Sequence, residues 1–334
     1  PHLRCRAFDL HPELILQAQQ AAQIIDEDLF ELGGDVEIGI DRDLRRWTLV
    51  AFAEDLESQR EPLTNEDTWI VSGGGSGVTA ASVIGVSKAS PDAGAHFVLL
   101  GRSSLIEECQ SWINWTEQQL NDEKMALRQT MTDANEEGKV TMVEWNKEWQ
   151  KYTRSLDIYN TIQQIADTGN SAQYCSVNVT DAEGLAELGA NLGRKITGIL
   201  HGAGLEDSKL VADKSNEIFN NVVRVKVDGW RALLGAVHAS GSENPRFACC
   251  FTSVAGRFGN GGQTDYAAAN CVLDSEMTRL TASGTCRAVA IGWTGWRDVG
   301  MATRGSIESV FEAAGIETLS VEEGVSIFVD EALS

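Results

Sequence analysis

The chain has 334 residues, with 27 lysines and arginines against 49 aspartates and glutamates, and a formal net charge of −22. This charge argues against nucleic acid or an acidic membrane surface as a partner. No apolar run approaches the ~20 residues of a membrane span. The seven cysteines form neither a Cys-x-x-Cys pair nor a cluster with histidines, so a reducing, cytoplasmic environment is expected, without a disulfide frame or a zinc site.

The first part of the chain, residues 1–62, lacks a glycine-rich turn and is not expected to bind a nucleotide. Strand-like runs are predicted at residues 4–9, 36–40 and 47–52, with a helical stretch from Pro12 to Leu32. The chain begins Pro-His-Leu-Arg, without an initiator methionine or a hydrophobic leader. We therefore expect a piece of a longer polypeptide.

Residues 63–334 are predicted to form an α/β domain with a doubly wound parallel sheet, because strand-like runs alternate with helical stretches. The first strand, residues 68–72, is followed by a glycine-rich turn that opens a helix. Glycines let the backbone approach a pyrophosphate closely, and the amides at the helix start stabilise its charge. The predicted cofactor-binding residues of this turn are Gly73, Gly74, Gly75, Ser76, Gly77 and Val78.

The second strand of this part, residues 95–101, is followed by Arg102. At this place an acidic residue binds the ribose hydroxyl of NAD, whereas a basic residue accommodates the 2′-phosphate of NADP. The sequence therefore predicts NADPH as the cofactor. The alternative for Arg102 is a solvated loop arginine.

A stretch of about residues 105–168 separates the second and third strands, which is far more chain than one crossover helix needs. Trp112 and Trp115 are three residues apart and Trp145 and Trp149 four apart, so each pair is predicted on one helical face. Residues 135–139, Asn-Glu-Glu-Gly-Lys, predict a turn between two helices. A helical hairpin that packs its own tryptophans is preferred to a docking surface, which exposed tryptophans would support.

The most informative segment runs from Phe251 to Asn270. It places Ser253 and Tyr266 thirteen residues apart, with Asn270 one helical turn after the tyrosine. Reduction of a ketone by a nicotinamide hydride leaves charge on the carbonyl oxygen, so the site needs a proton-donating hydroxyl and a second donor that holds the oxygen. Tyr266 and Ser253 have these groups. Because a phenol has a pKa near ~10, a neighbouring cation is also needed. Asn270 cannot supply that charge, and Lys226, in the helix predicted before this strand, is the candidate.

Lys226-Val-Asp-Gly together with Ser253 and Tyr266-x-x-x-Asn270 resembles the ketoreductase domains of polyketide synthases and multifunctional fatty acid synthases, within the short-chain dehydrogenase/reductase superfamily. The resemblance implies a Rossmann-like fold, with Tyr266 as proton donor and Ser253 as hydrogen-bond donor to the carbonyl. It also implies that Lys226 is the cation near the phenol and that Asn270 organises the network. The alternative is a serine and a tyrosine that are merely buried on a strand and a helix.

Further cofactor contacts follow from the resemblance. Asn178 and Val179 stand in the third strand where the family carries an Asp-Val pair against the adenine, and the Asn178 amide can pair with a base edge. Thr79 replaces the usual last glycine of the turn, a change that we expect the helix start to tolerate. Residues 201–204 resemble the family's His-Ala-Ala-Gly, whose backbone lines the cofactor; they are His201, Gly202, Ala203 and Gly204. A packing role is expected for the His201 side chain, with no part in proton transfer.

The resemblance also addresses the substrate. Asp207 aligns with the first aspartate of a Leu-Asp-Asp signature, although Glu206 and Ser208 break the rest of it. Phe258 stands where the opposite stereochemical class carries tryptophan, and together these features favour a 3R hydroxyacyl product. The segment that contains Trp293, Trp296 and Met301 resembles the family's Trp-Gly-x-Trp run. It precedes an expected lid over the acyl chain, at about residues 297–315.

The predicted function is NADPH-dependent reduction of a 3-oxoacyl chain on acyl carrier protein, within a multidomain polyunsaturated fatty acid or polyketide synthase. Residues 1–62 resemble the truncated structural subdomain of such ketoreductases, and the helical insertion resembles those of polyunsaturated fatty acid synthases. Docking of an acidic carrier protein requires a local basic patch, for which the candidates are Arg224, Arg231, Arg297 and Arg304; scattered surface arginines are the alternative. The alternative functions are an inactive scaffold domain and a free-standing reductase of small carbonyl compounds.

Overall fold

The structure is a computed structural model that describes residues 6–30, 36–53, 60–135, 138–297, 299–300 and 315–334. The chain divides into two compact units, Pro1–Glu57 and Ser58–Ser334, and each unit contains one sheet. Within the described residues, no helix has the length and apolar character needed to cross a membrane.

The smaller unit has a three-stranded sheet in the order β1-β2-β3, with β1 at Ala7–Leu10, β2 at Glu37–Ile40 and β3 at Arg46–Trp47. β1 pairs with β2 in parallel, and β3 pairs with β2 antiparallel. The predicted helix begins as a 3-10 turn, Pro12–Gln17, and continues as α1, Ala18–Phe30. The third strand is shorter than predicted, since residues 48–52 are exposed and lie outside β3.

The larger unit is built on a six-stranded sheet in the order β6-β5-β4-β7-β8-β9, in which every pair is parallel. The strands are β4 Thr68–Ser72, β5 His96–Gly101, β6 Ser171–Ser176, β7 Gly198–His201, β8 Phe247–Ser253 and β9 Arg287–Trp293. The order reverses at β4, which is flanked by β5 and β7. In such sheets, ligands bind outside the carboxyl ends of the strands at this switch point.

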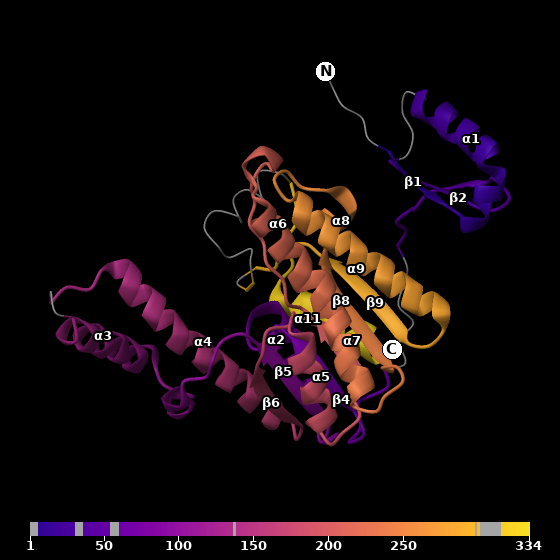
Figure 1. The fold of residues 1–334 in the computed structure, drawn as a ribbon. Helices are drawn as coiled ribbons and strands as arrows, with labels where there is room; N and C mark the ends of the chain where they lie inside the picture. The colour runs from indigo at the N-terminus through magenta and orange to yellow at the C-terminus, as the bar shows by residue number, and fades with distance from the viewer. Residues whose placement is uncertain (1–5, 31–35, 54–59, 136–137, 298, 301–314) are drawn as a thin grey trace. The chain divides into compact units, whose positions relative to one another are not determined.

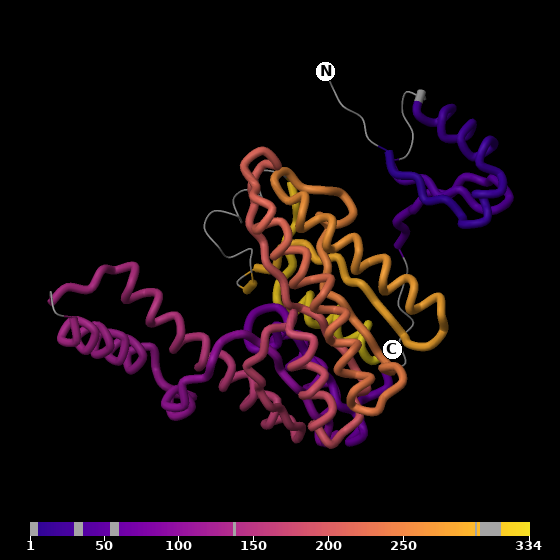
Figure 2. The backbone as a smooth tube through the Cα atoms, viewed as in Figure 1, coloured from indigo at the N-terminus to yellow at the C-terminus, as the bar shows by residue number. Residues whose placement is uncertain are grey.

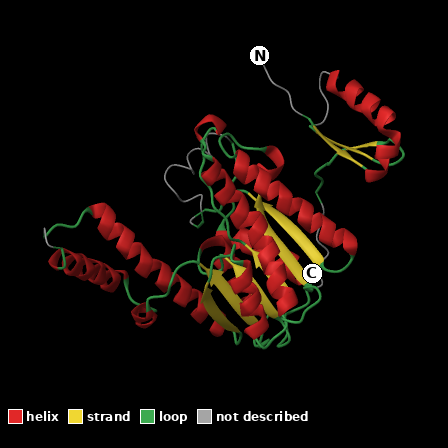
Figure 3. Ribbon diagram, viewed as in Figure 1, coloured by secondary structure: helices red, strands yellow, loops and turns green. Residues whose placement is uncertain are grey.

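Helices cover both faces of this sheet, as Figures 1 and 3 show. One layer contains α2 Gly77–Ala89, α4 Met142–Ala166 and α11 Val321–Leu333. The other contains α5 Ala182–Asn191, α7 Gly229–Ala239 and α9 Thr264–Ser283. Alternate strand residues enter opposite cores: Val71 packs with Phe328, and Ile70 packs with Trp230. Burial on both faces explains why the central strands β4, β5, β7 and β8 are largely apolar, and the predicted doubly wound sheet is confirmed.

The helix before β8 is not a regular α-helix. It consists of α6, Asn216–Val223, then a π-helical turn, Arg224–Asp228, and then α7. Figure 2 shows the backbone running on without a break from α6 into α7. A π turn inserts extra backbone into a helix and is frequent at functional sites. Here the turn carries Lys226.

The insertion forms the predicted helical hairpin, with α3 at Glu117–Asp133 packed against α4. Trp112 stacks on Trp115, with 5.1 Å between ring centroids, and on Trp149 at 6.0 Å. Trp112 and Trp115 do not share a helix, because the 3-10 turn Glu107–Trp112 ends at the first of them. The Trp145 indole donates a hydrogen bond to the Lys124 carbonyl across the hairpin, at 2.9 Å. With Trp112 and Trp145 buried, the tryptophans serve packing within the hairpin.

Candidate active site

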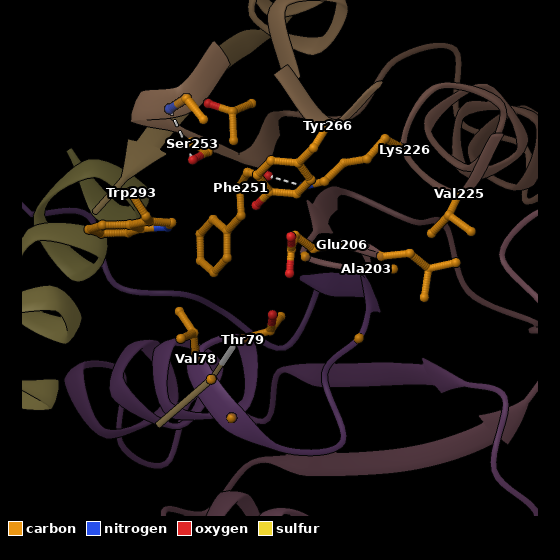
Figure 4. Close-up of a pocket in the computed structure, with 18 of the residues that line it drawn as sticks. Val78, Thr79, Ala203, Glu206, Val225, Lys226, Phe251, Ser253, Tyr266 and Trp293 are labelled. Carbon is orange, nitrogen blue, oxygen red and sulfur yellow. Dashed lines mark hydrogen bonds between the residues drawn. The ribbon is translucent and has the colours of Figure 1, made fainter. Parts of the chain in front are cut away.

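A cavity of about 1120 Å³ opens at the carboxyl ends of the parallel strands. Its wall includes the glycine-rich turn at one end and the Ser253 and Tyr266 segments at the other. Figure 4 shows Tyr266, Ser253 and Lys226 on one side, Val78 and Thr79 on the opposite side, and Glu206 between them. The cavity therefore joins the two regions that the sequence marks separately as a nucleotide site and a reaction site.

The glycine-rich turn connects β4 to α2. Gly73 has a φ of 74°, and a Cβ there would lie 3.0 Å from the Ala203 backbone nitrogen, so only glycine fits. Ser76 begins α2 without capping it through its side chain, which leaves the first amides of the helix available to an anion. These features fit the diphosphate of a dinucleotide. Of the six predicted residues, Gly73, Ser76, Gly77 and Val78 line the cavity.

Gly74 and Gly75 lie behind the turn and are not part of the cavity wall. A Cβ on Gly74 would come 2.6 Å from Val71 Cγ1, and one on Gly75 would come 2.7 Å from Ile158 Cγ1. Their place differs from the predicted one. They are glycines because the turn packs closely on β4 and α4.

The residues predicted at the adenosine end all line the cavity. Arg102 follows β5, is exposed, and forms no ion pair with the described residues. Asn178 is also exposed, and its Oδ1 accepts a hydrogen bond from the Thr180 amide at 3.2 Å. Val179 is buried beside Gly229. Because the Arg102 guanidinium forms no ion pair with the described residues, it is available to bind a phosphate.

Ser253 ends β8 and begins the short helix α8, Val254–Phe258. Its Oγ accepts a hydrogen bond from the Ala255 amide at 3.1 Å, so the hydroxyl has its own proton to donate on the cavity side. Tyr266 stands in the first turn of α9, with 8% of its surface exposed. Burial raises the pKa of the Tyr266 phenol, whereas hydrogen bonding by the Asn270 and Ser253 side chains lowers it. The phenol therefore carries its proton at neutral pH.

Lys226 is buried, with 3% of its surface exposed. Its Nζ donates a hydrogen bond to the Phe251 carbonyl at 2.5 Å, and a Cβ on Gly204 would lie 2.9 Å from its Cε. Burial lowers the pKa of Lys226 to about 8, while the nearby Cys250 and Asp274 raise it. The Lys226 side chain lines the cavity and is bonded to β8, the strand that ends at Ser253.

Asn270 is fully buried, and its Nδ2 donates to the Tyr266 carbonyl at 2.8 Å, one turn earlier in α9. Its Oδ1 has no hydrogen-bond partner among the described residues. Because this amide holds the backbone of Tyr266, it acts on the position of the tyrosine from within the helix.

His201 lies under the cavity and does not line it, whereas Gly202, Ala203 and Gly204 do. Its Nε2 is 2.9 Å from the Lys226 carbonyl oxygen, which can only accept a hydrogen bond, so Nε2 carries the proton. In the neutral ring Nδ1 then accepts from Ser72 Oγ at 2.6 Å, and Ser72 Oγ in turn accepts from the Ala203 amide at 3.2 Å. Burial lowers the pKa of His201 to about 3, so the ring stays neutral.

At the substrate end, the structure corrects the place of Asp207. The Asp207 carboxylate lies 3.3 Å from Lys209 Nζ and is not part of the cavity wall. Glu206 and Ser208 line the cavity instead. Phe258 stands at the cavity edge with 78% of its surface exposed.

Trp293 and Trp296 both line the cavity, and their rings meet edge to face with 5.0 Å between centroids. Trp296 is buried against Gly324 of α11. Met301 and most of the expected lid, residues 301–314, lie outside the described residues.

The family model for the KR domain matches residues 68–298, which is more than half of the chain. The chain belongs to the KR domain family. A KR domain is a ketoreductase that uses a nicotinamide cofactor, and the glycine-rich turn and the Ser253, Tyr266 and Lys226 cluster both fall within the matched residues.

Curated relatives of this KR domain are parts of large synthases. It is 27% identical over 296 residues, 86% of the chain, to a subunit of the polyunsaturated fatty acid synthase of Thraustochytrium sp.. It is 35% identical over 182 residues, 52% of the chain, to polyketide synthase ThaG of Burkholderia thailandensis. The chain spans only 10% and 3% of the lengths of these two relatives.

Solved structures share the fold of this KR domain. A ketoreductase domain from the bacillaene assembly line has a TM-score of 0.66 at 20% identity, with 98% of this chain and 67% of that one covered. An A-type ketoreductase from a modular polyketide synthase has a TM-score of 0.69 at 21% identity, with 98% and 58% covered.

Reasoning from sequence missed one group in the site of this KR domain. Gln263, three residues before Tyr266, donates through Nε2 to Glu206 Oε1 at 3.2 Å and to Ser208 Oγ at 3.1 Å. All three residues line the cavity. The only signal available in the sequence was the departure of Glu206 and Ser208 from the family signature at these positions.

The arginines considered for carrier docking do not form an uncompensated basic patch on the described surface of the KR domain. Arg224 and Arg231 lie 3.7 Å and 3.5 Å from the Asp228 carboxylate, and Arg297 lies 3.3 Å from Glu323. Arg304 lies outside the described residues. The neighbouring carboxylates offset these charges, which agrees with scattered surface arginines.

Proposed function

We propose that this KR domain uses NADPH to reduce a 3-oxoacyl thioester to the 3-hydroxyacyl thioester. The observation that carries the proposal is the meeting of Ser253, Tyr266 and Lys226 at one end of a cavity whose other end is the glycine-rich turn. A bound dinucleotide supplies the hydride. The protein must then supply a proton and stabilise charge on the carbonyl oxygen.

Each hydroxyl is suited to one of these tasks. The free proton of Ser253 makes it the donor that holds the carbonyl oxygen. Tyr266, whose pKa is raised by burial, gives its proton to the oxygen as negative charge develops there. Carbon 3 of the acyl chain gains the hydride and its oxygen gains the proton, so the product is an alcohol.

We assign to Lys226 the role of the cation near the Tyr266 phenol. A protonated amine stabilises the phenolate that Tyr266 becomes once it has given up its proton. Asn270 holds the backbone of the tyrosine, and the cation is held by the Phe251 carbonyl on the neighbouring strand. We assign positioning, and not proton transfer, to Asn270.

The preference for NADPH rests on Arg102. Its place after β5 is where a dinucleotide site meets the 2′ position of the adenosine ribose, and a guanidinium pairs well with a phosphate. Asn178 and Val179 contribute to the adenine side of the same cavity.

The proposed substrate class is based on the kinds of enzyme to which this domain is similar. Polyketide synthases and part of a polyunsaturated fatty acid synthase are among them, so we propose a 3-oxoacyl chain carried by the phosphopantetheine of an acyl carrier protein. We further propose that residues 1–62 are part of the structural subdomain, that residues 63–334 are the catalytic subdomain, and that both lie among other domains of such a synthase.

We propose the 3R configuration for the product. The proposal rests on the resemblance at Asp207 and Phe258; Asp207 is not part of the cavity wall, whereas Phe258, Glu206 and Ser208 are. Separation of the product enantiomers on a chiral column tests this point, and a 3S product would contradict it.

The test of the reaction follows NADPH oxidation by absorbance with 3-oxoacyl thioesters. Tyr266→Phe removes the proton donor, and kcat should fall about 10²- to 10⁴-fold. Tyr159→Phe, a tyrosine of the helical hairpin, is the matched control and should leave kcat unchanged. Cofactor binding without turnover of any thioester would favour a scaffold domain. Faster turnover of small free ketones would favour a free-standing reductase.

A further inference from the structure

Thr79 occupies a position in the nucleotide-binding turn where this family usually has a glycine, and from the sequence it is simply a tolerated change. In the structure it is the third residue of α2. Only 4% of its surface is exposed, and what remains accessible belongs to the cavity wall. Thr79 therefore has a buried side chain that faces the cofactor site.

The Thr79 side chain has room because the residue opposite it, after the neighbouring strand β7, is a glycine. A Cβ on Gly202, which follows β7, would overlap Thr79 Oγ1 and lie 2.7 Å from Thr79 Cγ2. The family's His-Ala-Ala-Gly has alanine at the position of Gly202. The family thus pairs a glycine in α2 with an alanine after β7. In this chain the same two positions hold Thr79 and Gly202, so the larger side chain lies on the helix.

The hydroxyl of Thr79 is not used by the protein. Among the described residues it has no hydrogen-bond partner. A threonine inside a helix commonly bonds the carbonyl four residues earlier, but here that carbonyl, on Gly75, lies before the helix and accepts from Thr161 Oγ1 at 3.2 Å. Figure 4 shows the Thr79 oxygen directed into the cavity.

Because the Thr79 hydroxyl opens on the cavity and bonds no other described residue, a ligand in the cavity can accept its hydrogen bond. We propose that Thr79 is an additional binding residue for the dinucleotide, and that its hydroxyl donates a hydrogen bond to the cofactor's diphosphate. The diphosphate is the fitting acceptor because Thr79 stands in the first turn of α2, where uncapped amides already favour an anion. This inference rests on the proposed function, since it requires a dinucleotide in the cavity.

The experiment measures the Kd of NADPH by fluorescence titration, without substrate. Thr79→Val keeps the shape and removes the hydroxyl, so its Kd should rise about tenfold. Thr79→Ser keeps the hydroxyl and should bind within about twofold of the native chain. Thr132→Val, in the helical hairpin, is the matched control and should bind as the native chain does.

A second pair of variants tests whether the Thr79 side chain packs in the space left by Gly202. Gly202→Ala should lower Tm, because its Cβ meets Thr79. The double variant Thr79→Gly with Gly202→Ala should recover Tm and yet bind NADPH as weakly as Thr79→Val. This pair decides the matter even if Thr79→Val fails to fold.

Two results overturn the inference in distinguishable ways. Native binding of NADPH with an unchanged Kd in Thr79→Val overturns the role of the hydroxyl and leaves the proposed function intact. Failure of the native chain to bind any nicotinamide dinucleotide overturns the proposed function, and the inference with it.

Discussion

The ring of His201 holds the backbone of Lys226: its Nε2 donates to the Lys226 carbonyl at 2.9 Å, within the π-helical turn. The Gly229 amide also donates to the Lys226 carbonyl, so the histidine is a second donor to the same oxygen. The other ring nitrogen bonds Ser72, the residue before the glycine-rich turn. His201 thereby links the cofactor-binding turn to the backbone of the lysine.

This linkage predicts a pH-dependent stability. Burial depresses the pKa of His201 to about 3 from the ordinary 6.5, so between these values the unfolded chain binds a proton that the native chain rejects. The free energy of unfolding should therefore fall as pH falls below 6.5, by up to about 1.4 kcal/mol per pH unit. Denaturant titrations at pH 7 and pH 5 measure this fall.

His201→Gln, which does not titrate, should be less stable at pH 7 but show a smaller fall. An equal fall in His201→Gln would contradict the assignment, and exposed His238→Gln is the control.

Lys226 predicts the alkaline limit of activity. Its pKa is lowered to about 8 by burial, so the amine loses its charge as pH rises through 8, while the phenol of Tyr266, with a raised pKa, keeps its proton. The kcat of ketone reduction should therefore fall above pH 8. Lys226→Arg keeps the charge and should move this limit upward, and Lys226→Met should lower kcat about 100-fold. A pH profile of Lys226→Arg identical to the native one would rule out the lysine as its origin; exposed Lys195→Met is the control.

Beside the tyrosine, Lys214 and Asp265 form an ion pair whose side chains are 3% and 1% exposed. Asp265 also accepts from the Tyr266 amide at 2.9 Å, and Lys214 donates to the Gly262 carbonyl at 3.0 Å. Lys214→Met leaves a buried carboxylate unpaired and should cost about 3–5 kcal/mol in the free energy of unfolding, measured with denaturant. Arg279→Met breaks the exposed pair with Glu276 and should cost less than about 1 kcal/mol. Equal losses in the two variants would mean that burial of the Lys214 pair contributes nothing.

Arg102 predicts the choice of cofactor. Arg102→Ala should raise the Kd of NADPH about 10- to 100-fold and leave the Kd of NADH unchanged, because only NADPH carries the 2′-phosphate. Fluorescence titration with both dinucleotides measures this difference. Arg194→Ala, an exposed arginine away from the cavity, is the control. A parallel loss of affinity for both cofactors would contradict a role in phosphate recognition.

Local patterns in the sequence were enough to predict the α/β fold, and they proposed the residues of the cofactor turn and the reaction site. Strand and helix periods are properties of a few neighbouring residues, and the segment from Ser253 to Asn270 contains only the end of β8, the short helix α8, a turn and the start of α9. The parallel sheet then brings its carboxyl ends together at one edge, so residues that follow different strands meet in one cavity. Lys226 was predicted from the resemblance of its motif, and the structure places it in the wall of the same cavity.

Only the tertiary structure decided what those residues touch. The bonds from His201 join positions 129 and 25 residues apart, and no local period specifies them. Asp207 and Glu206 are neighbours in an irregular segment, where a shift of one residue exchanges the side chain that faces the cavity. From the sequence, Thr79 is only a departure from the family's usual glycine. The structure explains it by placing Gly202 against it, because the space available to a side chain depends on the element packed on it.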